Sequence, residues 1–299
     1  MPRLSRRELD KLVRKLSASA NPSQQSQALD KIMSLCRDAD ESGLAAIAAA
    51  GVLRNLAGNA ENVVAIVAAG SVPTLVQLLG PGPPEVQQNA ICALGELVQY
   101  PRNTAIIAAA GAVPQLVQLL GSGSPADVQF DAARALGFLA LQTAEIRSTI
   151  AAAGAAPPLV QQLGPGSPSY VQCTAAATLS ILASNADNAT AIAAAGAIPP
   201  LVQLLGSGSP ADLQHCATLA LAVLADNNAD IRTAIAGAGA IPALVQLLGP
   251  GSPADLRLFA SGTLRALAHD SGNSLAIQSA GATAGFLQEM NDLGILIVQ

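Results

Sequence analysis

The sequence predicts an all-α solenoid of short helical repeats, and three observations support this. Glycines recur at a nearly fixed interval, the apolar residues between them follow helical spacing, and aromatic side chains for one globular core are scarce. The recurring glycines lie 41, 43, 42, 43 and 42 residues apart, at Gly70, Gly111, Gly154, Gly196, Gly239 and Gly281. This period is typical of stacked helical repeats.

The composition suits thin layers of helices. The chain has 299 residues, of which 51% are hydrophobic and only 2% aromatic. Alanine and leucine must therefore fill the interior. Small side chains let neighbouring helices approach closely in a solenoid, where each layer contacts only the next.

The charge distribution argues against general nucleic-acid binding. The formal net charge is −5, whereas a nucleic-acid binder needs a basic stripe to displace counterions from phosphates. Residues 1–20 carry a net charge of +4 and the remainder carries −9. We therefore expect no nucleic-acid partner.

No targeting or membrane-spanning segment is expected. The sequence lacks the apolar run of about 18 residues that a membrane-spanning helix needs, and its start lacks a signal-peptide pattern. A transit peptide is the alternative reading of the basic start, but Glu8 and Asp10 within it favour a capping helix. We expect a cytoplasmic protein without a membrane span.

Each repeat is predicted to contain three helices. A short alanine-rich helix ends at the recurring glycine, which adopts the left-handed conformation without steric penalty. A proline two or three residues later, such as Pro114, occupies the first position of the second helix. After a Gly-x-Gly turn the third helix begins, with Ser124 as its N-cap, Pro125 at the first position and Asp127 at the third.

The pattern Gly-Ala-x-Pro-x-Leu-Val-x-Leu-Leu, followed by a loop and a long helix with Ala-x-x-x-Leu, resembles the armadillo repeat. The resemblance covers residues 71–281 in five copies. Residues 1–70 are expected to form an irregular N-terminal capping unit and first short helix, and residues 282–299 a C-terminal capping helix with an apolar tail. The resemblance implies a right-handed superhelical α-solenoid of three-helix armadillo repeats, whose third helices line a concave groove. HEAT repeats are the alternative, but they lack this regular pattern of glycine and proline at the helix boundaries.

The first unit is irregular, because Gly51 and Gly70 are only 19 residues apart. One helix and its loop are missing between two helical fragments, which can fuse through Gly51 at a cost of about 1 kcal/mol. We predict that helices over residues 6–18, 23–37 and 43–57 form one capping unit, with Asn55 toward the groove.

No cofactor, metal or catalytic site is predicted. The segment from Gly121 to Ala126 fits the dinucleotide pattern G-x-G-x-x-A, but a helix precedes it where a strand is required. Asp226, Asn228 and Asp230 mimic a calcium loop that lacks its turn glycine and closing glutamate. We therefore expect a protein that is not an enzyme.

Histidines and cysteines are too dispersed to indicate a reactive pair. His215 and His269 fall in different repeats, with no cysteine or carboxylate at catalytic spacing. The cysteines show none of the close spacing of a zinc site or a disulfide-stapled fold. They are Cys36, Cys92, Cys173 and Cys216. We expect all four to be reduced thiols in the core or the groove.

The candidate binding residues lie on the third helices. Aligning these helices on their Ala-x-x-x-Leu core places three positions of each helix on one outward face. These positions are Gln88, Cys92 and Glu96; Phe130, Arg134 and Phe138; Cys173, Ala177 and Ile181; His215, Leu219 and Val223; and Leu258, Gly262 and Ala266. They differ in every repeat while the frame is nearly copied. This favours a recognition surface over drift at unconstrained positions.

Two functions are compatible with these patterns. The resemblance implies a non-enzymatic scaffold that binds a protein or an extended peptide in the groove. The alternative is a structural, self-associating or engineered repeat module with no evolved ligand, which the nearly identical repeats support.

The C-terminal tail is apolar, with Leu293, Ile295, Leu296, Ile297 and Val298 close together. Burying five such side chains stabilises a fold by roughly 7–15 kcal/mol at most. We predict that the tail packs on the last repeat or on a second chain, giving a homo-oligomer. Deleting residues 293–299 should lower the melting temperature or the mass in solution, and no change in either would refute this.

Overall fold

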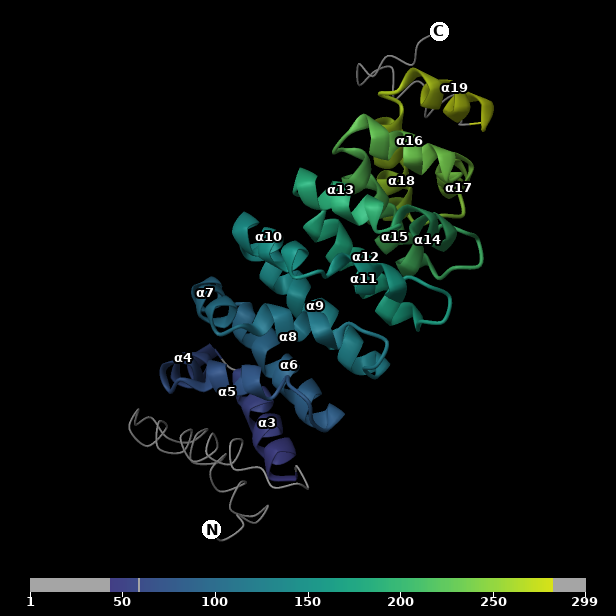
Figure 1. The fold of residues 1–299 in the computed structure, drawn as a ribbon. Helices are drawn as coiled ribbons and strands as arrows, with labels where there is room; N and C mark the ends of the chain where they lie inside the picture. The colour runs from purple at the N-terminus through teal and green to yellow at the C-terminus, as the bar shows by residue number, and fades with distance from the viewer. Residues whose placement is uncertain (1–43, 59, 282–299) are drawn as a thin grey trace. The chain divides into compact units, whose positions relative to one another are not determined.

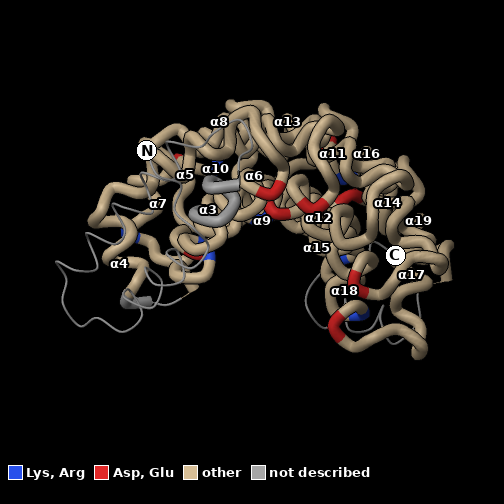
Figure 2. The backbone as a smooth tube through the Cα atoms, turned by 90° about the horizontal axis from the view of Figure 1, so that it is seen from below, with Lys and Arg blue, Asp and Glu red and all other residues tan. Residues whose placement is uncertain are grey.

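The structure is a computed structural model that describes residues 44–58 and 60–281. Helix follows helix along this range (Figure 1), and the described residues contain no strand. Few residues carry charge (Figure 2), as expected for a sequence with 12% charged residues. The predicted all-α fold is confirmed.

Two short helices follow each long helix from α3 to α15, and the short helix α19 follows α18. The described helices are α3 (Leu44–Ala57), α4 (Ala60–Ala68), α5 (Ser71–Gln77), α6 (Pro84–Val98), α7 (Pro101–Ala109), α8 (Ala112–Leu119), α9 (Ala126–Gln142), α10 (Ala144–Ala152), α11 (Ala156–Gln162), α12 (Ser169–Leu182), α13 (Ala186–Ala194), α14 (Ile198–Leu204), α15 (Ala211–Ala225), α16 (Ala229–Gly237), α17 (Ala240–Leu247), α18 (Ala254–Leu267) and α19 (Ser271–Ser279). The long third helices of the repeats are α6, α9, α12, α15 and α18.

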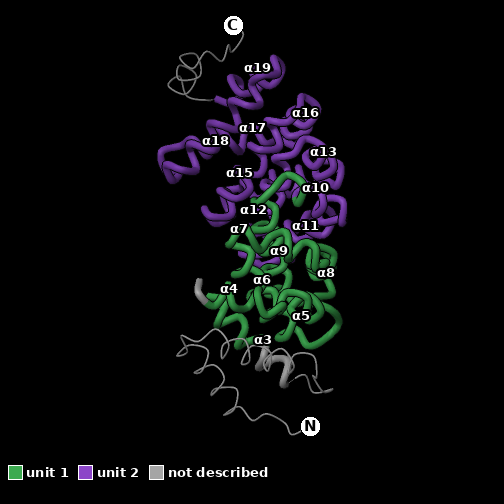
Figure 3. The backbone as a smooth tube through the Cα atoms, turned by 90° about the vertical axis from the view of Figure 1, so that its left-hand side faces the viewer, with its two compact units in different colours: residues 1–146 green, residues 147–299 purple. Residues whose placement is uncertain are grey.

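The chain divides into two compact units, residues 1–146 and residues 147–299 (Figure 3). In the first unit, α3 packs on α6 and α6 packs on α9. In the second unit, α12 packs on α15 and α15 packs on α18. Each second helix also packs on the third helix of its own repeat. The third helices are thus the common packing partners within each unit.

Alanine and leucine fill the interior of both units, as the composition predicts. Ala132 and Leu136 of α9 are fully buried, as are Ala217 and Leu221 of α15. Their small or compact side chains allow close packing of neighbouring helices.

The recurring glycines adopt the predicted left-handed conformation. Their φ angles lie between 71° and 85°, and no other described residue has a positive φ. Gly111, with φ of 82°, directly follows Ala110, the C-cap of α7, and directly precedes α8. This reversal separates the first helix of a repeat from the second.

The prolines of the second helices lie one or two positions later than predicted. Helix α8 begins at Ala112, so Pro114 is its third residue, and Pro157 is the second residue of α11. The physical reason for tolerating proline still applies, because none of the first helical N–H groups has a partner within the helix.

The predicted start of the third helix is wrong by one residue. Pro125 is the N-cap of α9, with φ of −57° and ψ of 151°, so Ser124 lies outside the helix and Asp127 is its second residue. Proline fixes φ at a helical value but leaves ψ extended here. The Pro125 carbonyl accepts the first helical hydrogen bond, from the Gln129 N–H at 3.0 Å.

A glutamine in the first turn of the third helix closes the turn that precedes it. Gln129 Nε2 donates to the carbonyls of Gly121 at 2.9 Å and Ser124 at 3.0 Å. Gln87, Gln172 and Gln214 make equivalent bonds in their repeats, and Arg257 donates to the Ser252 carbonyl in α18. These side chains satisfy carbonyls that have no partner within the second helix.

An asparagine ties each of several short first helices to the third helix before it. The side chains of Asn103, Asn188 and Asn273 donate to the carbonyls of Leu97, Leu182 and Leu267, respectively. All three asparagines are buried. Their hydrogen bonds offset the cost of removing the amides from water.

The fused helix predicted over residues 43–57 is confirmed as α3, which runs without a break through Gly51. Asn55 is exposed on it. The helices predicted over 6–18 and 23–37, and the apolar tail, lie outside the described residues. Among the described helices, none has the length and apolarity to cross a membrane.

Replacing Gly51 by alanine tests the continuous helix. A Cβ there would lie 3.5 Å from Asn89 Nδ2, an ordinary contact. We expect Gly51→Ala to raise the free energy of unfolding by about 1 kcal/mol, because alanine loses less backbone entropy than glycine in a helix. Denaturant melts would measure it.

Gly111→Ala is the matched control, because φ at Gly111 is positive. It should lower the free energy of unfolding by about 1–2 kcal/mol. Destabilisation by both variants would contradict a helical Gly51.

Candidate functional site

The outward positions of the third helices differ in exposure. Most are half-buried, namely Gln88, Glu96, Phe130, Arg134, Phe138, Cys173, Ile181, His215, Leu219 and Val223. Leu258 is 68% exposed, whereas Cys92 is only 5% exposed. Cys92 therefore offers little surface to a ligand.

In the first unit, Arg134 lies between two aromatic rings of its own helix. Its guanidinium carbon is 5.9 Å from the centre of the Phe130 ring and 5.8 Å from that of Phe138. The Arg134 side chain is 33% exposed. An arginine in contact with two aromatic faces is held by cation–π attraction as well as by packing.

A buried carboxylate fixes the other side of Arg134. Asp131 Oδ1 accepts a hydrogen bond from Arg134 Nη2 at 3.2 Å, and Asp131 Oδ2 accepts one from Gln88 Nε2 at 3.2 Å. A buried carboxylate is stable only when its oxygens are paired in this way. Because Gln88 belongs to α6 and Asp131 to α9, the arrangement joins two repeats. We call Gln88, Phe130, Asp131, Arg134 and Phe138 the Arg134 cluster.

The sequence prediction omitted Asp131 from the site. It lies one residue beyond the outward position of Phe130, and the helical alignment therefore passed over it. The available signal was an acidic residue three positions before an arginine, a spacing that brings two helical side chains together.

Cys92 lies beside this cluster as a neutral thiol. Burial raises its pKa above the ordinary value, and the Asp131 carboxylate raises it further, while Arg54 and Arg134 lower it. A thiol with a raised pKa is a poor nucleophile. Cys92 is thus a packing residue of the first unit.

Arg54 is a further cation of the first unit. It is exposed on α3, and its Nη1 donates to Asn89 Oδ1 of α6 at 3.4 Å. The bond joins α3 to α6 near the outward positions of α6.

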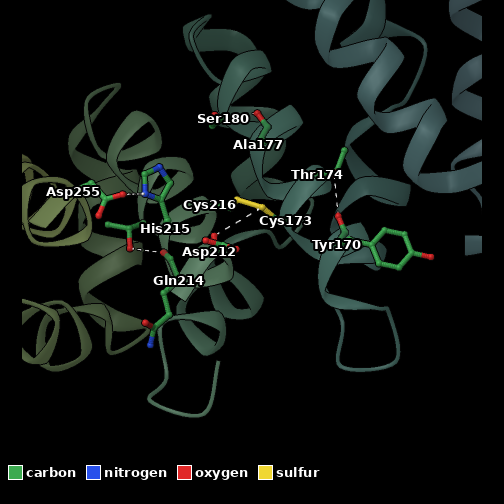
Figure 4. Close-up of a disulfide and its surroundings, with 11 residues drawn as sticks. Tyr170, Cys173, Thr174, Ala177, Ser180, Asp212, Gln214, His215, Cys216 and Asp255 are labelled. Atoms are coloured by element: carbon green, nitrogen blue, oxygen red, sulfur yellow. Dashed lines mark hydrogen bonds and ion pairs between the residues drawn. A yellow bond between two sulfur atoms is a disulfide. The ribbon is translucent and has the colours of Figure 1, made fainter. Parts of the chain in front are cut away.

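In the second unit, His215 links α15 to α18 (Figure 4). Its Nδ1 lies 3.5 Å from Asp255 Oδ2, and its ring meets the Phe259 ring edge to face at 4.7 Å between centres. His215 is half-buried and Asp255 is exposed. This corner of the face is polar, whereas Ile181, Leu219 and Val223 make the rest of it apolar.

The expectation of four reduced cysteines is wrong. Cys173 and Cys216 form a disulfide between α12 and α15 (Figure 4). The two residues are 43 positions apart, which is one repeat, so the stacking of two third helices brings their Cα atoms to 5.4 Å. This separation suits a disulfide. The sequence alignment of the third helices instead pairs Cys173 with His215, the residue directly before Cys216.

Known proteins show which family has this architecture. The armadillo/β-catenin-like repeat family matches residues 59–99 and 101–140. A crystal structure of computationally designed armadillo repeat proteins for modular peptide recognition has 28% sequence identity and a TM-score of 0.72, covering 80% of this chain and 99% of that chain. The chain belongs to the armadillo repeat family.

Other solved structures resemble this armadillo repeat protein. A crystal structure of an engineered protein has 31% identity and a TM-score of 0.74, covering 81% of this chain and 99% of that chain. A designed armadillo repeat protein in complex with the peptide (KR)4 has 27% identity and a TM-score of 0.65, covering 87% of this chain and 99% of that chain. A search of curated proteins found no match.

In this armadillo repeat protein, the variant Arg134→Ala tests whether Arg134 stabilises the buried carboxylate of Asp131. The variant leaves Asp131 buried without its cationic partner, so we expect the free energy of unfolding to fall by about 1–3 kcal/mol. Arg265→Ala, at an exposed position of α18, should change it by less than about 0.5 kcal/mol. Equal effects in denaturant melts would show that Asp131 does not depend on Arg134.

Proposed function

We propose that this armadillo repeat protein is a non-enzymatic scaffold that binds a protein or an extended peptide on the outward faces of its third helices. The observation that carries the proposal is the Arg134 cluster, a partly exposed group of aromatic and arginine side chains held in place by a buried carboxylate. Designed members of the family that recognise peptides add support.

The Arg134 cluster has the properties of a binding centre. Aromatic and arginine side chains contribute most of the energy at protein interfaces. Arg134 is already held by two rings and by Asp131, so it loses little conformational freedom on binding. Its remaining N–H donors suit carbonyl or carboxylate oxygens of a ligand.

The outward face of the second unit, taken by itself, suits apolar groups of a ligand. Its apolar side chains lie beside the polar corner of His215 and Asp255. Leu258 is exposed, and Ile181, Leu219 and Val223 are half-buried. Apolar ligand side chains would remove these groups from water. We place the protein in the cytoplasm as part of the same proposal.

Phe138→Ala tests the binding centre. A displayed library of random linear peptides would be selected on the full-length protein, and dissociation constants of the selected peptides would then be measured. We expect Phe138→Ala to weaken binding by about 1–3 kcal/mol, or roughly 5- to 150-fold, with unchanged helical content by circular dichroism.

Leu141→Ala is the matched control, because Leu141 lies on the same helix and is 57% exposed without being an outward position of the alignment. It should leave binding unchanged. A loss of helicity in Phe138→Ala would instead assign Phe138 to the core and refute the proposed binding centre.

A second candidate function is a self-associating or engineered repeat module with no evolved ligand. It is favoured by the solved structures described above, which are engineered or designed proteins. Light scattering over a concentration series would show a rising mass for a self-associating module. A constant mass together with peptide selection would favour the scaffold.

A further inference from the structure

The Cys173–Cys216 disulfide lies between two neighbouring repeats on their outward helices. Cys173 is half-buried on α12 and Cys216 is half-buried on α15. Both sulfurs therefore lie near the surface of the second unit, in contrast to the buried Cys92. Small thiol compounds can approach a disulfide in such a position.

The packing of α12 on α15 includes buried contacts besides the covalent bond. These helices contact each other, and Ala175, Leu179, Ala217 and Leu221 are fully buried in them. The same kind of stacking joins α15 to α18 without a disulfide. Breaking the bond should therefore leave the helices stacked and the sulfurs close enough to rejoin.

We propose that Cys173 and Cys216 form a reversible thiol–disulfide exchange site that covalently links two neighbouring repeats in its oxidised form. The proposal concerns the second unit alone and is independent of whether the third helices bind a peptide. Its substrates are small thiols and their disulfides.

Reduction of the Cys173–Cys216 disulfide takes two exchange steps. A reductant thiolate attacks one sulfur of the pair, the Cys173–Cys216 bond breaks, and a mixed disulfide forms. A second reductant thiol attacks that mixed disulfide and leaves as part of the oxidised reductant. Two electrons pass to the protein sulfurs, which take up two protons as thiols. An oxidised small-molecule disulfide reverses both steps.

The reduced form has a local partner for one thiol. Cys173 Sγ lies 3.9 Å from the Asp212 carbonyl oxygen (Figure 4). Once it carries a hydrogen, this sulfur can donate to that carbonyl as a weak hydrogen bond. We therefore expect both oxidation states to be accommodated without rearranging α12 or α15.

Oxidation should strengthen one boundary of the repeat array. Neighbouring repeats stabilise one another mainly through their shared interface, and a crosslink between positions 43 residues apart also restricts the unfolded chain. Reduction should lower the melting temperature by about 5–10 °C while leaving the helical content unchanged at room temperature.

The experiment uses the full chain equilibrated in glutathione buffers of graded redox potential. Free thiols are trapped with iodoacetamide and located by mass spectrometry. We expect Cys173 and Cys216 to lose and regain alkylation together, and reversibly, as the potential changes. Cys92, which is buried and has a raised pKa, should be alkylated only after denaturation, whatever the redox potential of the buffer.

The variant Cys173→Ser/Cys216→Ser provides the matched control for the melting temperature. Reduction should leave its melting temperature unchanged while lowering that of the unmodified protein. The proposal is overturned if Cys173 and Cys216 are free thiols at every redox potential, that is, if both are alkylated after denaturation in every buffer. It is equally overturned if reduction unfolds the protein, or shifts the variant as much as the unmodified protein.

Discussion

Each third helix must bury its small side chains against the third helix beside it, since a single repeat has too little apolar surface to fold alone. Within each unit this requirement sets the positions of the other helices. The second helices cover the third helices of their own repeats, and the glycines with positive φ give the chain the reversal it needs between first and second helix. Side-chain amides of Gln129 and Asn188 then satisfy carbonyls at the helix ends.

Features that depend on one short stretch of chain could be predicted from the sequence. The conformation of Gly111 and the continuation of α3 through Gly51 follow from local backbone preferences and helical spacing. The start of α9 could be placed only to within one residue, because proline fixes φ and not ψ. At Pro125 the extended ψ moves the helix start to Ala126.

Features that depend on register between helices could not be predicted in the same way. The Cys173–Cys216 bond and the Gln88–Asp131 hydrogen bond both join residues about one repeat apart. A shift of one residue along a helix turns a side chain by about 100°, so aligning repeats by sequence does not specify which side chains meet. Asp131 and Cys216 were missed for this reason, although both lie beside predicted positions.

The glutamine in the first turn of α9 also affects what the preceding turn can tolerate. Because Gln129 holds the carbonyls of Gly121 and Ser124, the residues between these anchors are not needed to fix the path of the chain. The turn before α9 is therefore a surface site where a foreign segment could be grafted. Such a graft would begin and end on backbone already anchored to α9.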